Sequence, residues 1–438
     1  PVEGVTLHSR AKHGPVWSPD GRHMAFVQDS VLWMIPVRPD GLPEGSPERL
    51  TTEAADSPSW TGDSRSIVYL SFGKLRRIDV ESGEITDLPL DLQWQHSRPA
   101  AASVLHVGRL YDGVHGAYRR NVDVVIENGR IRDIVPHRPS WPGIPSVDLS
   151  SYTVVPGLFQ MHVHHFLTDG ERDGRNWLAF GITSVREPGA DPYEALERRE
   201  SWAAGSRIGP RLFYAGILEG SRLFYWMNIP IAAPAPVEIE LQRSLALDYD
   251  FIKTYERMDE RVMKRIVEFA HDHGLKVASH EIFPAALYGA DFVEHLGTED
   301  RMSYPDRESP AARVYDDALE IMTHSGISIV PTTAGRSPSE PYLYEMLRHP
   351  HIFDLPQIQA WPTRWRQAAQ RTHDWLKSDM SDRLPIVANQ MQALNAIGRR
   401  GIRIGTGTDG GTDSHGYSLI LELIYLSESG LGNHAALQ

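Results

Sequence analysis

Apolar and polar positions follow two different patterns along the chain. In roughly the first 90 residues, short runs carry an apolar residue at every second position, and turn residues such as Asp20-Gly21 and Ser82-Gly83 separate them. A period of two is expected of β-strands with one buried face, so these runs predict an all-β region. After residue 156, short apolar runs alternate with longer stretches of helical period, which predicts a mixed α/β region.

The β region contains an internal repeat. The segment 15–21 aligns with 58–64 at an offset of 43 positions, and the match continues downstream, as at Phe26 and Tyr69. About 40–45 residues is the length of one β-propeller blade, and the Trp-Ser-Pro-Asp-Gly turn resembles the blades of TolB-like propellers. Two blades cannot close a ring that needs about 4–8. We interpret residues 1–95 as part of such a propeller; one β-rich domain with a chance echo is the alternative.

Two further units are predicted downstream. Residues 103–155 contain short strands joined by turns such as Asn128-Gly129, which indicates a small β-sandwich unit. Residues 156–438 predict a (β/α)8 TIM-like barrel. An open doubly wound sheet is the alternative fold, but the sequence lacks its Gly-x-Gly-x-x-Gly turn after the first strand. The runs predicted to be barrel strands are 159–164, 182–186, 211–215, 251–255, 276–280, 292–295, 328–332 and 403–408.

Composition excludes several kinds of site. The formal net charge is −13, from 44 Lys and Arg against 57 Asp and Glu, which argues against a general nucleic-acid surface. No window reaches about 18 uninterrupted apolar residues, so no membrane span is predicted. Cysteine is absent, which excludes disulfides, thiolate metal ligands and a cysteine nucleophile.

The most specific local signal is His162-Val163-His164 at the end of the first predicted barrel strand. Residues two apart on a strand point to the same face, so both imidazoles can reach one metal ion while Val163 faces the other way. With 20 histidines in the chain, this pair alone equally fits an ordinary polar strand end. We expect the neighbouring His165 to face away and to be structural.

Other predicted strands also end in polar residues. Lys253 lies in an apolar run where a lone ammonium would be costly unless paired or neutralised. His280, His295 and Asp409 follow the ends of three further strands. Because catalytic groups of a barrel gather at the carboxyl ends of its strands, these residues are candidate site residues.

These motifs resemble the metal-dependent amidohydrolase superfamily, and within it the imidazolonepropionase-like amidohydrolase and dipeptidase group. The resemblance covers the chain from about residue 103 onward. The shared motifs, in chain order, are Pro156-Gly157-Leu158, His162-Val163-His164, Gly181-Ile182-Thr183-Ser184-Val185-Arg186, Phe251-Ile252-Lys253, Ala278-Ser279-His280, Val293-Glu294-His295 and Gly407-Thr408-Asp409.

The resemblance implies a binuclear metal centre, with zinc as the expected metal. His162, His164 and Asp409 would hold one divalent ion, and His280 and His295 would hold the other. Lys253 would carry a carbamate that bridges both ions; an ion pair between this lysine and Glu256 or another carboxylate is the alternative. Asp409 would act as general base and then as general acid, while a metal-bridging hydroxide attacks the substrate carbonyl.

Several positions qualify this expectation. The superfamily usually has Asp where Gln160 stands, and a small residue where Glu281 follows His280. Tyr255 and His415 are candidate substrate contacts, and the apolar loop 222–227 is a candidate cap over the pocket. The chain begins with Pro1 and ends inside a predicted helix, before the last elements of the superfamily. We therefore expect a piece of a longer protein, stabilised as an oligomer or by a companion chain.

The sequence thus predicts an enzyme that hydrolyses a C–N bond in an amide, cyclic amide or dipeptide. A lactonase or esterase on the same binuclear site is one alternative, and a non-catalytic TolB-like interaction protein is the other. The expected partner is a small molecule or a short peptide. The TolB-like segment suggests the periplasm or export, by analogy alone.

Overall fold

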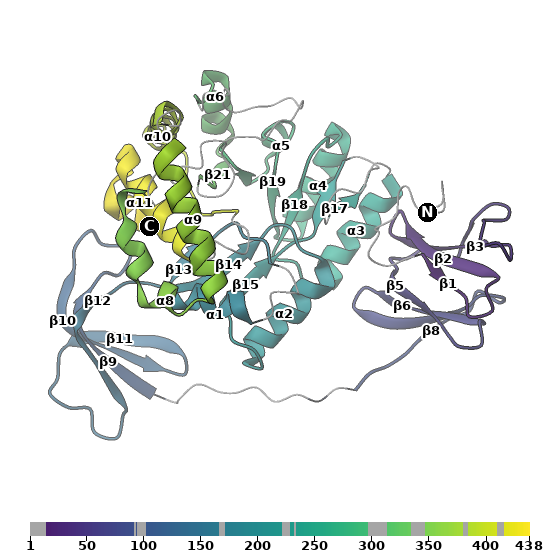
Figure 1. The fold of residues 1–438 in the computed structure, drawn as a ribbon, viewed down its shortest axis with the longest axis horizontal. Helices are drawn as coiled ribbons and strands as arrows, with labels where there is room; N and C mark the ends of the chain where they lie inside the picture. Colours follow the sequence, from purple (N-terminus) through teal and green to yellow (C-terminus); the bar gives the residue numbers. More distant parts are fainter. Residues whose placement is uncertain are drawn as a thin grey trace.

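The computed structural model describes residues 15–91, 93, 102–165, 171–220, 228–231, 234–296, 313–333, 347–379, 384–409 and 416–438. The two copies of the N-terminal repeat each form a four-stranded antiparallel meander (Figure 1). The first consists of β1 (Val16–Trp17), β2 (His23–Gln28), β3 (Val31–Pro36) and β4 (Glu48–Arg49). The second consists of β5 (Asp56–Trp60), β6 (Ser66–Ser71), β7 (Lys74–Asp79) and β8 (Ile85–Asp87).

The repeated turn has the same hydrogen bonds in both copies. The hydroxyl of Ser18 donates to Asp20 Oδ1 at 2.6 Å, and in the second copy the hydroxyl of Thr61 donates to Asp63 Oδ1, also at 2.6 Å. In each copy the aspartate also accepts a backbone N–H two residues further on. This aspartate turn joins β1 to β2 and β5 to β6, and it explains why the motif recurs in the sequence.

Residues 102–154 form one four-stranded sheet with the order β11-β10-β9-β12. Its strands are β9 (Ala102–Leu110), β10 (Arg119–Glu127), β11 (Arg130–Pro136) and β12 (Ser146–Val154). β12 runs parallel to β9, whereas the other pairs are antiparallel. Gly108 is required where these two parallel strands meet, because a Cβ there would lie 1.9 Å from the Ser150 carbonyl oxygen.

Seven of the eight predicted barrel strands are present, and all pair in parallel. They are β13 (Leu158–Gln160), β14 (Ile182–Glu187), β15 (Arg211–Tyr214), β18 (Phe251–Thr254), β19 (Lys276–Ser279), β20 (Phe292–Glu294) and β21 (Ser328–Val330). Two short strands were not predicted: β16 (Ile217–Glu219), which continues the line of β15, and β17 (Asn228–Pro230), which pairs with it. The strands divide into sheets of order β13-β14-β15 and β17-β16-β18-β19-β20-β21.

The eighth prediction, a strand over 403–408, is wrong in detail, because this segment forms only a single bridge between Ile404 and Ile329. The segment 403–408 nevertheless lies between β21, the last parallel strand, and β13, the first. The backbone N–H of Gly405 donates to Ile329 at 2.8 Å, and the N–H of Met161 donates to Thr406 at 2.8 Å. Gly407 permits this approach, because a Cβ there would lie 2.8 Å from the His162 nitrogen.

Helices separate the parallel strands. Capping by aspartate begins two of them: the Asp191 side chain accepts from the first turn of α2 and the Asp259 side chain from the first turn of α4. The α-helices are α1 (Arg172–Ala179), α2 (Pro192–Ala204), α3 (Pro234–Ala246), α4 (Glu260–Asp272), α5 (Ala285–Tyr288), α6 (Asp316–Ser325), α8 (Pro356–Gln359), α9 (Thr363–Asp379), α10 (Leu384–Arg399), α11 (Tyr417–Leu426) and α12 (Gly432–Leu437), with the short helices η2 (Pro350–Asp354) and η3 (Ser427–Leu431). No helix within the described ranges is long and apolar enough to span a bilayer.

A buried ion pair joins the N-terminal sheets to α3. Arg243 of α3 lies 3.1 Å from Asp56 of β5 and 3.5 Å from Glu240, and all three side chains are at most 2% exposed. The Ser30 hydroxyl, between β2 and β3, donates to Glu240. Because a charge removed from water is tolerated only beside its counter-charge, these contacts hold the two parts of the chain in one arrangement.

We predict that Asp56→Ala lowers the free energy of unfolding by about 3–5 kcal/mol, because it leaves the Arg243 charge buried without its main partner. The triple variant Asp56→Ala/Glu240→Gln/Arg243→Met, which removes all three buried charges, should recover much of this loss. Urea denaturation of the full chain measures both. The control is Glu238→Ala, whose partner Arg265 is 42% exposed and whose loss should cost under about 1 kcal/mol. Equal effects of Asp56→Ala and Glu238→Ala would contradict the prediction.

Candidate metal centre

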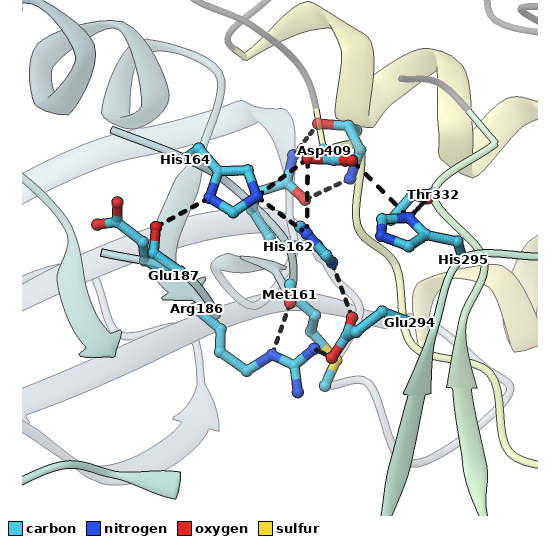
Figure 2. A network of polar contacts seen from close by, with 12 residues as sticks. Met161, His162, His164, Arg186, Glu187, Glu294, His295, Thr332 and Asp409 are labelled. Atoms are coloured by element: carbon cyan, nitrogen blue, oxygen red, sulfur yellow. Dashed lines mark hydrogen bonds and ion pairs between the residues drawn. The ribbon is translucent and has the colours of Figure 1, made fainter. Parts of the chain in front are cut away.

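Three of the predicted site residues meet at the carboxyl ends of the first and last parallel segments (Figure 2). His162 and His164 follow β13, and Asp409 follows the segment that lies beside it. The backbone N–H of Asp409 donates to the His162 carbonyl at 2.9 Å, which sets the two segments side by side. Val163 faces the other way and is 1% exposed, in accordance with the predicted alternation.

The donor atoms of these residues have the spacing of metal ligands. Nε2 of His162 lies 3.3 Å from Nε2 of His164, and these nitrogens lie 3.5 and 3.1 Å from Oδ1 of Asp409. A tetrahedral ion with bonds of about 2.1 Å holds its ligand atoms about 3.4 Å apart. Two imidazoles and a carboxylate also suit zinc and neighbouring divalent metals chemically. The residues therefore fit a divalent ion.

Hydrogen bonds orient both imidazoles toward this point. Nδ1 of His162 donates to Glu294 at 2.8 Å, and Nδ1 of His164 donates to the Gly189 carbonyl at 3.1 Å. Carboxylate and carbonyl oxygens only accept, so the proton of each neutral ring stays on Nδ1 and the lone pair on Nε2 faces the candidate ion. Partners of this kind are the usual support of metal-binding histidines.

Arg186 holds Glu294 in place, a role that the sequence alone did not reveal. Its guanidinium on β14 donates to Glu294 of β20 and, at 2.6 Å, to the Met161 carbonyl beside β13. Burial raises the pKa of Glu294, but the charges of Arg186 and Lys253 outweigh burial and hold the pKa of this carboxyl below its usual range. The sequence signal for this ion pair was a charged residue within each of two apolar strands, Arg186 in β14 and Glu294 in β20.

The second predicted group lies next to the first. The rings of His162 and His295 are 4.7 Å apart, as are those of His295 and His280, while Tyr255 lies 4.6 Å from His280. Nδ1 of His295 is hydrogen-bonded to Thr332 Oγ1 at 2.6 Å and lies 3.8 Å from Asp409 Oδ2. All these side chains thus share one end of the parallel strands.

Lys253 is 2% exposed on β18, and its charge contributes to the lowered pKa values of both Glu294 and His295. The structure thus brings together six predicted site residues: His162, His164, Lys253, His280, His295 and Asp409. Their roles as ligands stay predictions. His415 and the loop 222–227 lie outside the described residues.

The protonation states suit metal binding. Burial lowers the pKa of His162 to about 4 and that of His295 well below its ordinary value, so both imidazoles are neutral at pH 7. Burial raises the pKa of Asp409, but its contacts with His162 and His164 outweigh burial and keep this pKa below the usual range. Neutral imidazole and ionised carboxylate are the forms that bind metals.

Two of the candidate ligands have left-handed backbone. The φ angle of His295 is +66° and that of Asp409 is +48°. Among residues with a side chain, Asn, Asp and His are the types most enriched in this conformation. At both positions the backbone and the metal chemistry therefore favour the same residue types.

Two neighbouring residues lie outside this group. Gln160, where the superfamily usually has Asp, donates to Thr408 Oγ1 at 2.8 Å and accepts from the Thr408 N–H at 3.0 Å, so it ties the first and last parallel segments together. His165 packs at 5.7 Å from both Trp177 and Trp202, in agreement with its predicted structural role.

Comparison with known proteins gives the fold. The chain is similar to a Xaa-Pro dipeptidase solved with methionine in its active site, at 20% identity over 77% of this chain and 86% of that one (TM-score 0.55). A bottromycin amidohydrolase matches at 20% identity over 77% and 76% (TM-score 0.56). A prolidase solved with N-methylphosphonate-L-proline matches at 18% identity over 76% and 84% (TM-score 0.54).

No family model and no curated protein sequence matches the chain. At these identities the likeness concerns architecture alone. The chain has the mixed α/β fold of the amidohydrolases and prolidases, which confirms, for the fold, the resemblance that the motifs predicted.

We predict that Glu294→Gln weakens the binding of a divalent ion about 10- to 100-fold, because it removes the charged acceptor that orients His162. Titration of the metal-stripped chain with Zn²⁺ measures the affinity. Glu240→Gln is the matched control, since Glu240 is an equally buried carboxylate beside Arg243, outside the candidate centre. An unchanged affinity in Glu294→Gln would show that His162 is not held by this contact.

We also predict that the unfolding free energy of the metal-free chain falls as the pH is lowered from about 6.5 to about 4. Over this window unfolded His162 takes up a proton while folded His162 does not, because burial lowers its pKa to about 4 from 6.5. The contribution is on the order of 3 kcal/mol. Urea denaturation at pH 7 and pH 4.5 should give a smaller pH effect in His162→Gln than in the unchanged chain; equal effects would refute the assignment.

Proposed function

We propose that this chain is a metal-dependent hydrolase that cleaves amide C–N bonds at a binuclear centre. The observation that carries the proposal is the triangle of donor atoms formed by His162, His164 and Asp409, whose edges of 3.1–3.5 Å match the ligand spacing of a divalent ion. The fold shared with amidohydrolases and prolidases supports the same conclusion.

The proposed architecture is a (β/α)8 barrel. Seven parallel strands and the segment 403–409 follow one another, and hydrogen bonds from Met161 to Thr406 and from Asp409 to His162 join the last to the first. Separate apolar cores support the division of the chain into the three units 1–95, 103–155 and 156–438. The core of the first unit includes Leu32 and Ile67, and that of the second includes Val107 and Val124. The largest core belongs to the third unit and extends from Val163 to Ala436. Two four-stranded meanders are consistent with propeller blades in the first unit.

In the proposed centre, His162, His164 and Asp409 would hold one ion, and His280 and His295 would hold the second. Lys253, as its carbamate, would supply an anionic ligand to both. Zinc is the proposed metal. When bound, the ions polarise the substrate carbonyl and activate water as the nucleophile. Lys253 is buried, and its positive charge lowers the pKa of the neighbouring His295. A positively charged lysine here would repel a bound metal ion, whereas its anionic carbamate would attract one.

Asp409 is the residue that we assign to proton transfer in the reaction. Asp409 Oδ1 faces the two imidazoles, whereas Oδ2 lies on the side of His295, 3.8 Å from its Nδ1. We assign Oδ2 as the atom that accepts the proton of the attacking water and returns it to the departing nitrogen. Tyr255, beside His280 and 7% exposed, is the candidate donor to the substrate carbonyl oxygen.

The experiment is a hydrolysis screen of the full chain, loaded with Zn²⁺, over Xaa-Pro dipeptides, other dipeptides, N-acyl amino acids, cyclic amides and lactones. We expect turnover of at least one amide class. Asp409→Asn should lower kcat about 100- to 10,000-fold, because it removes the proton-transfer group. Asp248→Asn, whose side chain is 89% exposed, is the control and should be unaffected.

Near-normal activity in Asp409→Asn would overturn the role of Asp409. Turnover of lactones alone would favour the lactonase alternative. An inactive chain that binds no Zn²⁺ at any tested concentration would refute the proposed enzyme.

A further inference from the structure

A second group of metal-ligand residues lies on the sheet β11-β10-β9-β12, apart from the parallel strands (Figure 1). His106 on β9 pairs in register with Asp123 on β10 and with Asp148 on β12. His137, directly after β11, completes the row. Asp123, His106 and Asp148 thus lie on one line across the sheet, and His137 lies two positions beyond Val135, the β11 partner of Asp123.

The two imidazoles of this row are stacked. Their ring centroids are 3.5 Å apart and their planes differ by 11°. The stack brings imidazoles from two strand regions to one place, and the candidate ligand atoms of this group lie within 4.8 Å of one another. Because lone pairs lie in the plane of each ring, a shared ion requires one ring to turn out of the stack, which the partly exposed His106 can do about its Cα–Cβ and Cβ–Cγ bonds.

The hydrogen bonds of the two rings determine which nitrogen of each ring carries the proton. Nδ1 of His137 donates to Asp123 at 2.9 Å, and Nε2 of His106 donates to Asn121 Oδ1 at 3.1 Å. The lone pairs of the neutral rings are therefore on Nε2 of His137 and Nδ1 of His106. Nδ1 of His106 already lies 3.7 Å from Asp148.

Asp123 has the position of an orienting group rather than a ligand. It is 0% exposed, and besides His137 it accepts the Arg138 N–H and the Trp141 indole N–H, both at 2.8 Å. Its oxygens are thereby directed to donors of the protein. Asp148, in contrast, is exposed, and its side chain can turn toward an ion bound at Nδ1 of His106.

We propose that His106, His137 and Asp148 form a divalent transition-metal site on this sheet, with Asp123 and Asn121 orienting the imidazoles. Two imidazoles and a carboxylate select zinc, nickel, cobalt or copper over calcium and magnesium. The ion would connect β9, β12 and the end of β11, so it would stabilise this unit. The site is independent of the proposed hydrolase centre.

The test uses Ni²⁺ as the probe, with the full chain carrying His162→Gln and His280→Gln to weaken both ion positions of the other centre. Calorimetric titration of this metal-stripped protein should detect one site. His106→Gln or His137→Gln, added to it, should weaken that site at least tenfold, and Asp123→Asn about 10- to 100-fold. Gln at 137 retains a donor for Asp123, so the fold should be preserved, and the metal-free thermal midpoint checks this. Ni²⁺ should also raise the midpoint in the parent but not in these variants.

His115→Gln is the control, because His115 lies in the same unit, is 77% exposed and is hydrogen-bonded to Asp112 at 2.8 Å. Binding that is unchanged in both His106→Gln and His137→Gln would overturn the proposal. An equal loss in His115→Gln would also overturn it, since it would indicate adventitious binding to surface histidines. Hydrolysis by the otherwise unchanged chain should be the same with and without His106→Gln.

Discussion

Glu294 balances the charges on which the candidate centre depends. Its carboxylate lies between the Arg186 guanidinium and the His162 imidazole, with the Lys253 ammonium nearby in the metal-free chain, and it is 0% exposed. Any one of these groups alone would be costly to bury, yet together they compensate one another and fix the ring that faces the candidate ion. This carboxylate links β20 to Arg186 of β14 and to His162 after β13, although β20 lies in a different sheet from these two strands.

Backbone contacts place the remaining ligands. Gly407 lets the last parallel segment approach β13 closely, and Gln160 then links the two through Thr408. As a result, Asp409 lies beside His162. A substitution at Gly407 would therefore act directly on the ligand geometry, since a Cβ there would lie 2.8 Å from the His162 nitrogen and 2.9 Å from its Cβ.

Much of this arrangement was predictable because strand period and strand-end position are local properties. They located six candidate ligands from five parts of the chain, all of which the structure brings to one place. The partnership of Arg186 with Glu294 was not predictable, since nothing in a linear pattern says which buried charges meet. The segment 403–408 looked like a strand from its composition, but its glycines allow an extended path with a single bridge. The strand β16, which follows Gly216, was also not predicted; a Cβ at Gly216 would lie 2.8 Å from the Tyr249 hydroxyl.

The left-handed backbone at His295 and Asp409 has a consequence for engineering this centre. Alanine, the usual choice for deleting a side chain, would keep a Cβ in a conformation that costs roughly 1–2 kcal/mol for most residues. Glycine would remove the ligand and relax the chain at the same time, whereas asparagine would keep the backbone preference at both positions and, at Asp409, also the shape of the side chain. Variants at these two sites thus report on the backbone as well as on the chemistry, and only matched replacements separate the two.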